Sequence, residues 1–235
     1  MNVSVNLVDV FWERRFSLVG CAFLDDTLRM RRSYFHRTIP RLLPGAAALC
    51  LNCAVAYAGD RVPSTWVNGA YSFSDELGGF KITGTGGNGT RENPFVISQE
   101  VFSASPVTLV IRGQRPVRTF DPSGDYPNGF THFRFEVRNV SGLGWLECAF
   151  ELQEVLNKAS VFGDGLSFDQ RRTDTDTISS DSFSRWSRDF EPYDKLLFTG
   201  GKVDPLTVAT FSFLVTDFTP KRTFYIVFDP SIPFS

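Results

Sequence analysis

Hydrophobic and polar residues alternate strictly along the middle of the chain. In 131–139 the apolar residues Phe133, Phe135 and Val137 alternate with charged ones, and after a glycine-rich turn the pattern resumes in 146–152. A period of two is the signature of a strand that buries one side. We expect an antiparallel hairpin here, with arginines of the first strand paired to glutamates of the second.

The end of the chain repeats the pattern. Ala209, Phe211, Phe213 and Val215 alternate with the other residues of 209–216, turn residues follow at 217–222, and a second alternating run covers 224–228. These segments predict a second hairpin.

Shorter strand patterns occur at 94–102, 107–112, 117–120 and 195–199, and 151–158 is the one segment after residue 58 with a helical pattern, of one or two turns. Each half-apolar sheet needs a second apolar face to cover it. The predicted fold class is therefore all-β, a two-sheet antiparallel β-sandwich of the Ig-like or jelly-roll-like kind, preceded by a signal-peptide helix.

The pattern changes before residue 59. Arginines around 29–41 precede an apolar run at 42–55, and Ala56-Tyr57-Ala58 has the small residues of a cleavage site. We expect residues 30–58 to be a signal peptide and 59–235 a single β-sandwich domain. Residues 1–29 are either an upstream extension or a mis-assigned start before Met30.

Cleavage near Ala58-Gly59 predicts a protein that is secreted, periplasmic or held at the cell surface. An uncleaved anchor is the weaker interpretation, because Pro44, Gly45 and Asn52 interrupt a run already shorter than the ~20 apolar residues of a spanning helix. Membrane contact is expected only through the signal segment.

Charge and cysteine content fit an exported domain. Residues 1–58 carry net +3, and residues 59–235 carry net −5. An acidic body lacks the basic stripe that nucleic-acid binding needs. Cys148 is the one cysteine after residue 58 and lies on the apolar side of its strand, so we expect a buried, inert thiol.

Catalytic signatures are sparse. His132 is the one histidine after residue 58, and no G-x-S-x-G elbow accompanies it. One histidine and one cysteine do not supply the usual ligand set of a transition metal. We therefore predict no catalytic residues, no transition-metal site and no cofactor, with calcium as the exception to weigh.

Aspartates crowd into the long polar stretch that follows residue 163, and Asp121 and Asp125 flank a separate turn. Calcium takes six to eight oxygen ligands from such loops, although the stretch lacks the glycine and terminal glutamate of an EF-hand loop. The alternative is ordinary solvated turn chemistry. The candidate calcium ligands are Asp164, Asp169, Asp174, Asp176 and Asp181.

Aromatic residues in polar surroundings are candidates for ligand binding. Trp186 lies within Ser-Arg-Trp-Ser-Arg and Tyr193 follows shortly after. Such rings stack on sugars when they are exposed, and otherwise pack in the core. The exposure of Trp186 discriminates between the two.

The segment from Asn139 to Trp145, with Ser141 and Gly142 between them, resembles the N-x-[ST]-G-x-x-W hairpin of exported bacterial β-sandwich proteins, the PEP-CTERM-like extracellular domains. Residues 164–168 and 207–217 are also similar to segments of such proteins. The resemblance implies secretion and a sandwich fold, and carries no catalytic residues. This chain lacks the hydrophobic helix and basic tail of the sorted members, so anchoring through such a tail is not expected.

The leading hypothesis is a noncatalytic, secreted β-sandwich that acts in extracellular binding or surface association, with an extracellular protein or a glycan as its unknown partner. The alternatives are a secreted carbohydrate-binding or carbohydrate-active protein and a calcium-stabilised adhesion module.

Overall fold

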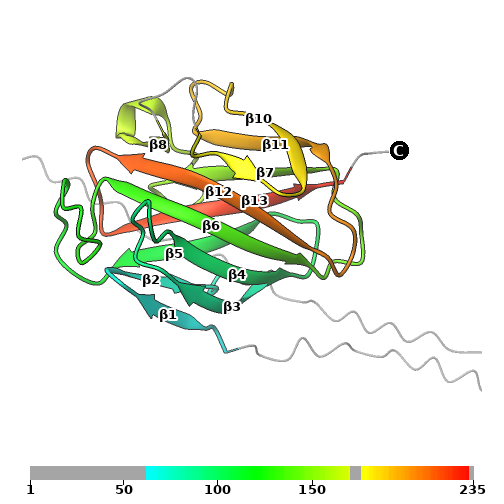
Figure 1. The fold of residues 1–235 in the computed structure, drawn as a ribbon, viewed down its shortest axis with the longest axis horizontal. Helices are drawn as coiled ribbons and strands as arrows, with labels where there is room; N and C mark the ends of the chain where they lie inside the picture. The colour runs from blue at the N-terminus through cyan, green and yellow to red at the C-terminus, as the bar shows by residue number, and fades with distance from the viewer. Residues whose placement is uncertain (1–61, 170–175, 233–235) are drawn as a thin grey trace, which may run out of the picture. The chain divides into compact units, whose positions relative to one another are not determined.

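Strands make up nearly all the regular structure of the computed structural model, which describes residues 62–169 and 176–232. The strands form two sheets that pack face to face (Figure 1), which confirms the predicted all-β sandwich. All described residues belong to one unit, Ala56–Ser235. The expected upstream segment (1–29) and signal peptide (30–58) lie outside the described residues.

Sheet A has seven strands in the order β1-β2-β5-β13-β7-β11-β10. These strands are β1 (Thr65–Asn68), β2 (Tyr71–Ser74), β5 (Val107–Gly113), β7 (Glu147–Gln153), β10 (Phe183–Ser187), β11 (Lys195–Gly201) and β13 (Thr223–Ser231).

Sheet B has the order β3-β4-β6-β12-β8, and the short strand β9 also pairs with β12. Its strands are β3 (Phe80–Gly86), β4 (Phe95–Val101), β6 (Phe130–Asn139), β8 (Leu166–Phe168), β9 (Ser179–Ser180) and β12 (Val208–Asp217). A single 3-10 turn, η1 (Phe162–Asp164), precedes β8.

One pair of strands departs from the expected antiparallel arrangement. β4 and β6 run parallel, with Phe95 opposite Phe133, whereas every other pair of described strands is antiparallel. The reason is topological, because β5 lies between them in sequence but belongs to sheet A. The chain leaves sheet B after β4, passes through sheet A and returns in its original direction.

The predicted central hairpin is also wrong, because its two strands lie in different sheets. β6 and β7 have the expected apolar sides, but β6 belongs to sheet B and β7 to sheet A. Their buried side chains meet across the core, where the rings of Phe135 and Phe150 lie 5.3 Å apart. Alternation shows which side of a strand is buried, and does not show whether the next strand lies beside it or above it.

The charges of β6 therefore find other partners than the predicted glutamates of β7. Arg138 forms an ion pair of 3.3 Å with Glu100 of the parallel neighbour β4. Arg134 lies 3.7 Å from Glu136 of its own strand. These pairs cover the outer face of sheet B.

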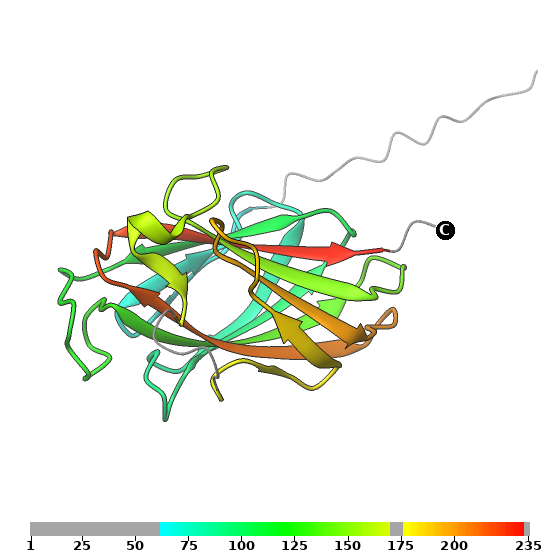
Figure 2. The ribbon, with the colours of Figure 1, turned by 90° about the horizontal axis from the view of Figure 1, so that it is seen from above.

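The predicted C-terminal hairpin is also a crossover. β12 pairs with β6 in sheet B, whereas β13 lies between β5 and β7 in sheet A. Figure 2 shows β12 (orange-red) and β13 (red) in opposite layers, joined at one end. Both strands turn phenylalanines into the core, and the rings of Phe211 and Phe228 lie 5.9 Å apart.

The segment from Asn139 to Trp145 forms the crossover from β6 to β7. The Asn139 side chain is fully buried, and its Oδ1 accepts hydrogen bonds from the backbone N and the hydroxyl of Ser141, at 3.1 and 2.7 Å. The indole N–H of Trp145, also buried, donates to the Ser141 hydroxyl at 3.1 Å. The polar residues of this segment therefore hold the turn that carries the chain between sheets.

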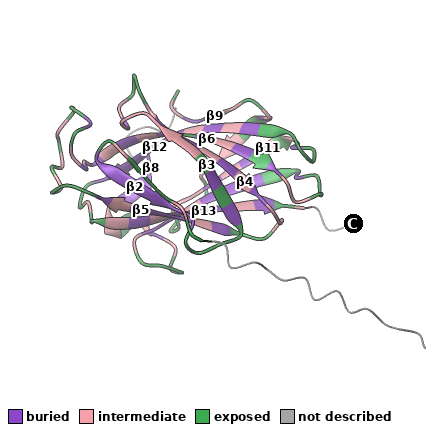
Figure 3. Cartoon of the chain, turned by 90° about the horizontal axis from the view of Figure 1, so that it is seen from below, coloured by how far each residue is buried: buried purple, intermediate pink, exposed green. Residues whose placement is uncertain are grey.

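Aromatic side chains fill the space between the sheets. Burying a large apolar side chain contributes about 1.5–3 kcal/mol, so this set dominates the stability of the domain. Figure 3 shows buried and less buried positions alternating along the strands. The largest fully buried side chains are Trp145, Phe73, Phe80, Phe95, Phe133, Phe135, Phe150, Phe168, Phe198, Phe211, Phe213 and Phe228.

Two shorter segments differ from expectation. Residues 117–120, predicted as a strand, form part of the β5–β6 loop, in which the side chain of Phe120 is 74% exposed. The predicted helical turns at 151–158 are absent, because β7 continues to Gln153 and a tight turn follows, with the Lys158 N–H bonded to the Val155 carbonyl.

Candidate functional site

Asp164, the first candidate calcium ligand, is committed to local hydrogen bonds. Asp164 ends η1, and its Oδ2 accepts hydrogen bonds from the Ser160 hydroxyl (2.7 Å) and the Val161 N–H (3.0 Å). Its Oδ1 accepts from the Leu166 N–H at 3.1 Å. This carboxylate therefore shapes the turn into β8.

Each of the other described candidates has a partner of its own. Asp169 is buried and accepts from the Thr177 hydroxyl at 2.9 Å, while Asp176 forms an ion pair of 2.9 Å with Arg91. Asp181 accepts from the Thr210 N–H at 2.8 Å. Asp174 lies outside the described residues.

In the ranges 62–169 and 176–232, no three His, Cys, Asp or Glu side chains are grouped to hold a metal ion. Calcium binding stays a prediction of the sequence, without a described cluster to support it.

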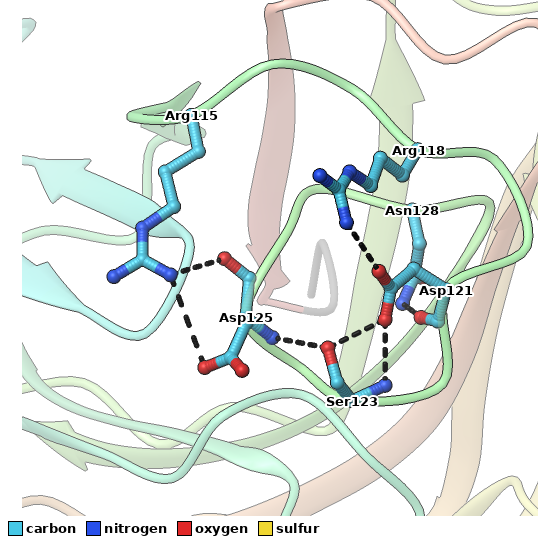
Figure 4. A network of polar contacts seen from close by, with 6 residues as sticks. All are labelled: Arg115, Arg118, Asp121, Ser123, Asp125 and Asn128. Carbon is cyan, nitrogen blue, oxygen red and sulfur yellow. Dashed lines mark hydrogen bonds and ion pairs between the residues drawn. The ribbon is translucent and has the colours of Figure 1, made fainter.

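The second acidic turn, in the β5–β6 loop, is also paired internally (Figure 4). Asp121 accepts from the backbone N of Ser123 at 2.9 Å and lies 3.5 Å from Arg118. A hydrogen bond from the Ser123 hydroxyl to the same carboxylate is the first cause that holds the pKa of Asp121 below its ordinary value, and the backbone bond adds to it. Arg115 donates to the Asp125 carbonyl at 2.9 Å. These carboxylates stabilise the β5–β6 loop, and they do not point toward one common position where a cation would bind.

The two candidate ligand-binding aromatics have different surroundings. Trp186 on β10 is partly buried and packs against the hydrophobic core, opposite Phe198 of β11. Tyr193 lies in the loop before β11 with 55% of its surface exposed. Tyr193 lines a pocket that Trp186 does not line, so the structure does not bring the two rings into this site.

The pocket beside Tyr193, here called the end pocket, has a volume of about 520 Å³. Small-ligand sites have volumes of about 300–1,000 Å³. The end pocket lies between η1, β8 and the loop that leads into β11. Its lining residues are Phe162, Ser167, Phe168, Arg188, Asp189, Glu191, Pro192, Tyr193, Asp194 and Lys195.

Hydrogen bonds fix the walls of the end pocket. Arg188 donates through Nη1 to the carbonyls of Phe168 (2.8 Å) and Asp169 (2.6 Å), which ties the loop before β11 to the end of β8. On the opposite side, the Phe162 N–H donates to the Pro192 carbonyl at 3.2 Å. Because both contacts join segments far apart in sequence, the pocket is formed by the fold and not by one loop.

The chemistry of the end pocket is mixed. Phe162 is 73% exposed, so two aromatic side chains, Phe162 and Tyr193, present surface to a ligand beside polar groups. Apolar walls with a few polar groups are typical of ligand sites, because the apolar part supplies affinity and the polar part orientation.

Asp194 is the polar group of the end pocket with the most perturbed environment. Burial raises the pKa of its carboxyl to about 6, Asp164 adds to the increase, and a hydrogen bond from Ser167 opposes it. Its Oδ2 is buried and has no hydrogen-bond partner among the described residues. A buried oxygen left unpaired costs free energy, so a ligand that donates a hydrogen bond here is favoured.

Two other reactive side chains lie elsewhere. Cys148 has no exposed surface, and burial raises the pKa of its thiol, which confirms the expected buried cysteine. His132 is half-buried on β6, opposite Leu214, and burial followed by the nearby Arg91 lowers its pKa. Neither residue lines the end pocket.

The sequence pattern singled out Tyr193 but missed Phe162 and Arg188. A signal was present, since residues 188–195 hold five charged residues and two aromatic rings in eight positions. No sequence pattern indicated that Phe162 of η1 lines the end pocket, because this depends on the fold placing residue 162 beside residue 192.

Comparison with known protein families, with curated proteins and with solved structures finds no match for this chain. Within the described ranges, no helix is long and apolar enough to span a membrane.

Proposed function

We propose that this protein is a noncatalytic, exported binding module whose end pocket binds a hydroxyl-rich ligand, a unit of an extracellular glycan. The supporting observation is the exposed pair Tyr193 and Phe162 beside carboxylates in one pocket. Aromatic rings offer flat apolar surface to the face of a sugar ring, and carboxylate oxygens accept hydrogen bonds from its hydroxyls.

Export is part of the proposal and rests on the sequence. The arginines, apolar run and Ala56-Tyr57-Ala58 site have the order of a signal peptide. A glycan of the cell envelope or the surroundings is a ligand that an exported module meets.

A second candidate function, glycoside hydrolysis, is favoured by one observation. Asp189, Glu191 and Asp194 share the end pocket, and the raised pKa of Asp194 suits a general acid. Such enzymes use a pair of carboxyl groups on either side of the scissile bond. Release of reducing ends from a bound glycan, lost in Asp194→Asn, distinguishes hydrolysis from binding alone.

A glycan array probed with the full chain tests the proposed function. We expect binding to neutral glycans, and a loss of affinity of about tenfold (about 1.4 kcal/mol) for Tyr193→Ala. Phe120→Ala is the matched control, because Phe120 is an exposed aromatic of another loop and should leave binding unchanged. Absence of glycan binding by the wild type, or equal binding by Tyr193→Ala, contradicts the proposal.

A further inference from the structure

A second hollow lies on the outer face of sheet A. This hollow, here called the sheet groove, has a volume of about 390 Å³ and crosses β5, β13, β7 and the start of β11. Its lining residues are Pro106, Thr108, Ala149, Glu151, Gln153, Asn157, Lys195, Val227 and Asp229.

The strand register forms the sheet groove from one straight row. Lys195 lies opposite Glu151, Glu151 opposite Val227, and Val227 opposite Thr108. Neighbouring strands are about 4.8 Å apart, so the row is about 14 Å long. Ala149, Thr108 and Val227 are small for outward-facing strand positions, and they leave the space that larger side chains would fill.

Lys195 joins the two hollows. It lines the end pocket as the first residue of β11, and it also lines the sheet groove at the start of the row. A ligand held at Tyr193 therefore reaches the outer face of sheet A by passing one side chain. The two hollows together are longer than a single small ring requires.

The polar groups along the sheet groove have capacity for a ligand. Gln153 donates to Glu151 at 2.8 Å, and the Asn157 N–H donates to Gln153 at 2.8 Å, which fixes both side chains. Lys195, Glu151 and Asp229 form no ion pair within 4.0 Å of a described residue, although Lys195 lies near enough to Asp229 to lower its pKa against the effect of burial. The charged pairs on the outer face of sheet B, in contrast, are already formed.

The charge of the path selects among ligands. Five carboxylates line the two hollows, against two cations, Arg188 and Lys195. An acidic path disfavours polyanions such as nucleic acids or sulfated glycans, because like charges repel. Hydroxyl groups, which donate to carboxylates and accept from Lys195 without a net charge, fit the path.

We propose that the end pocket and the sheet groove form one continuous binding path, and that its ligand is a linear, neutral oligosaccharide chain lying across β11, β7, β13 and β5. This inference rests on the proposed function and deepens it, from a single glycan unit to an extended polymer.

Calorimetric titration of the full chain with neutral oligosaccharides of increasing length tests the path. The probes are cello-, malto-, xylo- and chito-oligosaccharides, each from dimer to hexamer. We expect one series to bind, with affinity rising by about tenfold or more from dimer to hexamer as the sheet groove becomes occupied. Hexalysine serves as the cationic alternative.

Val227→Trp fills the sheet groove from an outward-facing strand position, where aromatic residues are well tolerated. We expect it to reduce hexamer affinity to that of the dimer and to leave dimer affinity unchanged. Val96→Trp is the matched control, since Val96 is a half-buried valine on the outer face of sheet B. Thr108→Trp, at the far end of the row, is the second variant should Val227→Trp fail to fold.

The outcomes separate the inference from the proposed function. Affinity that does not change with length, or hexamer binding that survives Val227→Trp and Thr108→Trp, confines the ligand to the end pocket and overturns the path alone. Tighter binding of hexalysine than of any oligosaccharide overturns the assignment of a neutral saccharide. Absence of binding to every oligosaccharide overturns both proposals.

Discussion

The two sides of β7 have different tasks within one short strand. On the inner side Cys148, Phe150 and Leu152 have no exposed surface, and the Phe150 ring lies 4.9 Å from that of Phe213. On the outer side Ala149 and Glu151 line the sheet groove. Alternate residues therefore belong to the core and to the proposed binding path.

This difference separates stability from binding. The inner residues are large and interdigitate with the other sheet, so their burial stabilises the fold. The outer residues are small or polar, and they leave an open surface at little cost to the core. A substitution at an inner position of β7 should therefore change the free energy of unfolding. A substitution at an outer position should change ligand affinity.

The largest effect on stability is expected for Phe150→Ala. Phe150 contacts the rings of both sheets, including Phe135, Phe198 and Phe228, so truncation leaves a cavity between the layers. We expect the free energy of unfolding to fall by about 3–5 kcal/mol in urea denaturation. Glu151→Ala, one position further, should change it by less than about 0.5 kcal/mol. Equal losses in the two variants would refute the division between the sides of β7.

Asn139→Ala tests whether hydrogen bonds stabilise the crossover that carries the chain from β6 into β7. The buried Asn139 amide donates to the carbonyls of Leu143 (2.7 Å) and Val203 (3.1 Å), and it holds Ser141 in the crossover. Losing these partners should lower the free energy of unfolding by about 2–3 kcal/mol. The exposed Asn93→Ala is the control, and a loss for Asn139→Ala no larger than the control's would show that the crossover is held by packing alone.

A smaller, pH-dependent effect is expected where the end pocket meets β11. Asp194 has a folded-state pKa of about 6 against an ordinary value of 3.8, so the native protein keeps a proton that the unfolded chain releases. Wild-type stability should therefore fall as pH rises from about 4 to 6. The full shift corresponds to about 3 kcal/mol, and solvent access to the carboxyl reduces the expected effect to about 1 kcal/mol.

Asp194→Asn removes this titration. Relative to wild type, the variant should gain about 1 kcal/mol at pH 7 compared with pH 4, measured by urea denaturation at both values. Burial also raises the pKa values of Asp217 and Asp229, but both residues are present in the two proteins and cancel. Asp204→Asn, on an exposed loop, should show no such gain, and an equal gain there would contradict the role of burial.

Strand positions were predictable from sequence because alternation depends on local spacing. The buried sides of β6, β12 and β13 are the apolar positions of the pattern, and Cys148 is buried as expected. The pairing of strands was not predictable in this way. Both predicted hairpins are crossovers. A strand with one apolar side can bury that side equally well next to the preceding strand in the same sheet or facing it in the opposite sheet.

The candidate site depends on the same nonlocal information. Tyr193 was identified from its polar neighbours, but the residues opposite it come from η1 and β8. The row of the sheet groove joins Thr108, Glu151, Lys195 and Val227, which the strand order of sheet A alone brings together. No local pattern marks such a row.

The crossovers also bear on how quickly the domain assembles. Because β6 leads into the opposite sheet, its neighbours within sheet B are β4 and β12, and the β12 pairing joins Phe135 to Phe211. Loop-closure entropy must be lost before such distant pairings contribute, so proteins dominated by them fold in milliseconds to seconds. The domain should therefore fold slowly. Until the two sheets pack together, its aromatic strands stay exposed and can pair with strands of other chains.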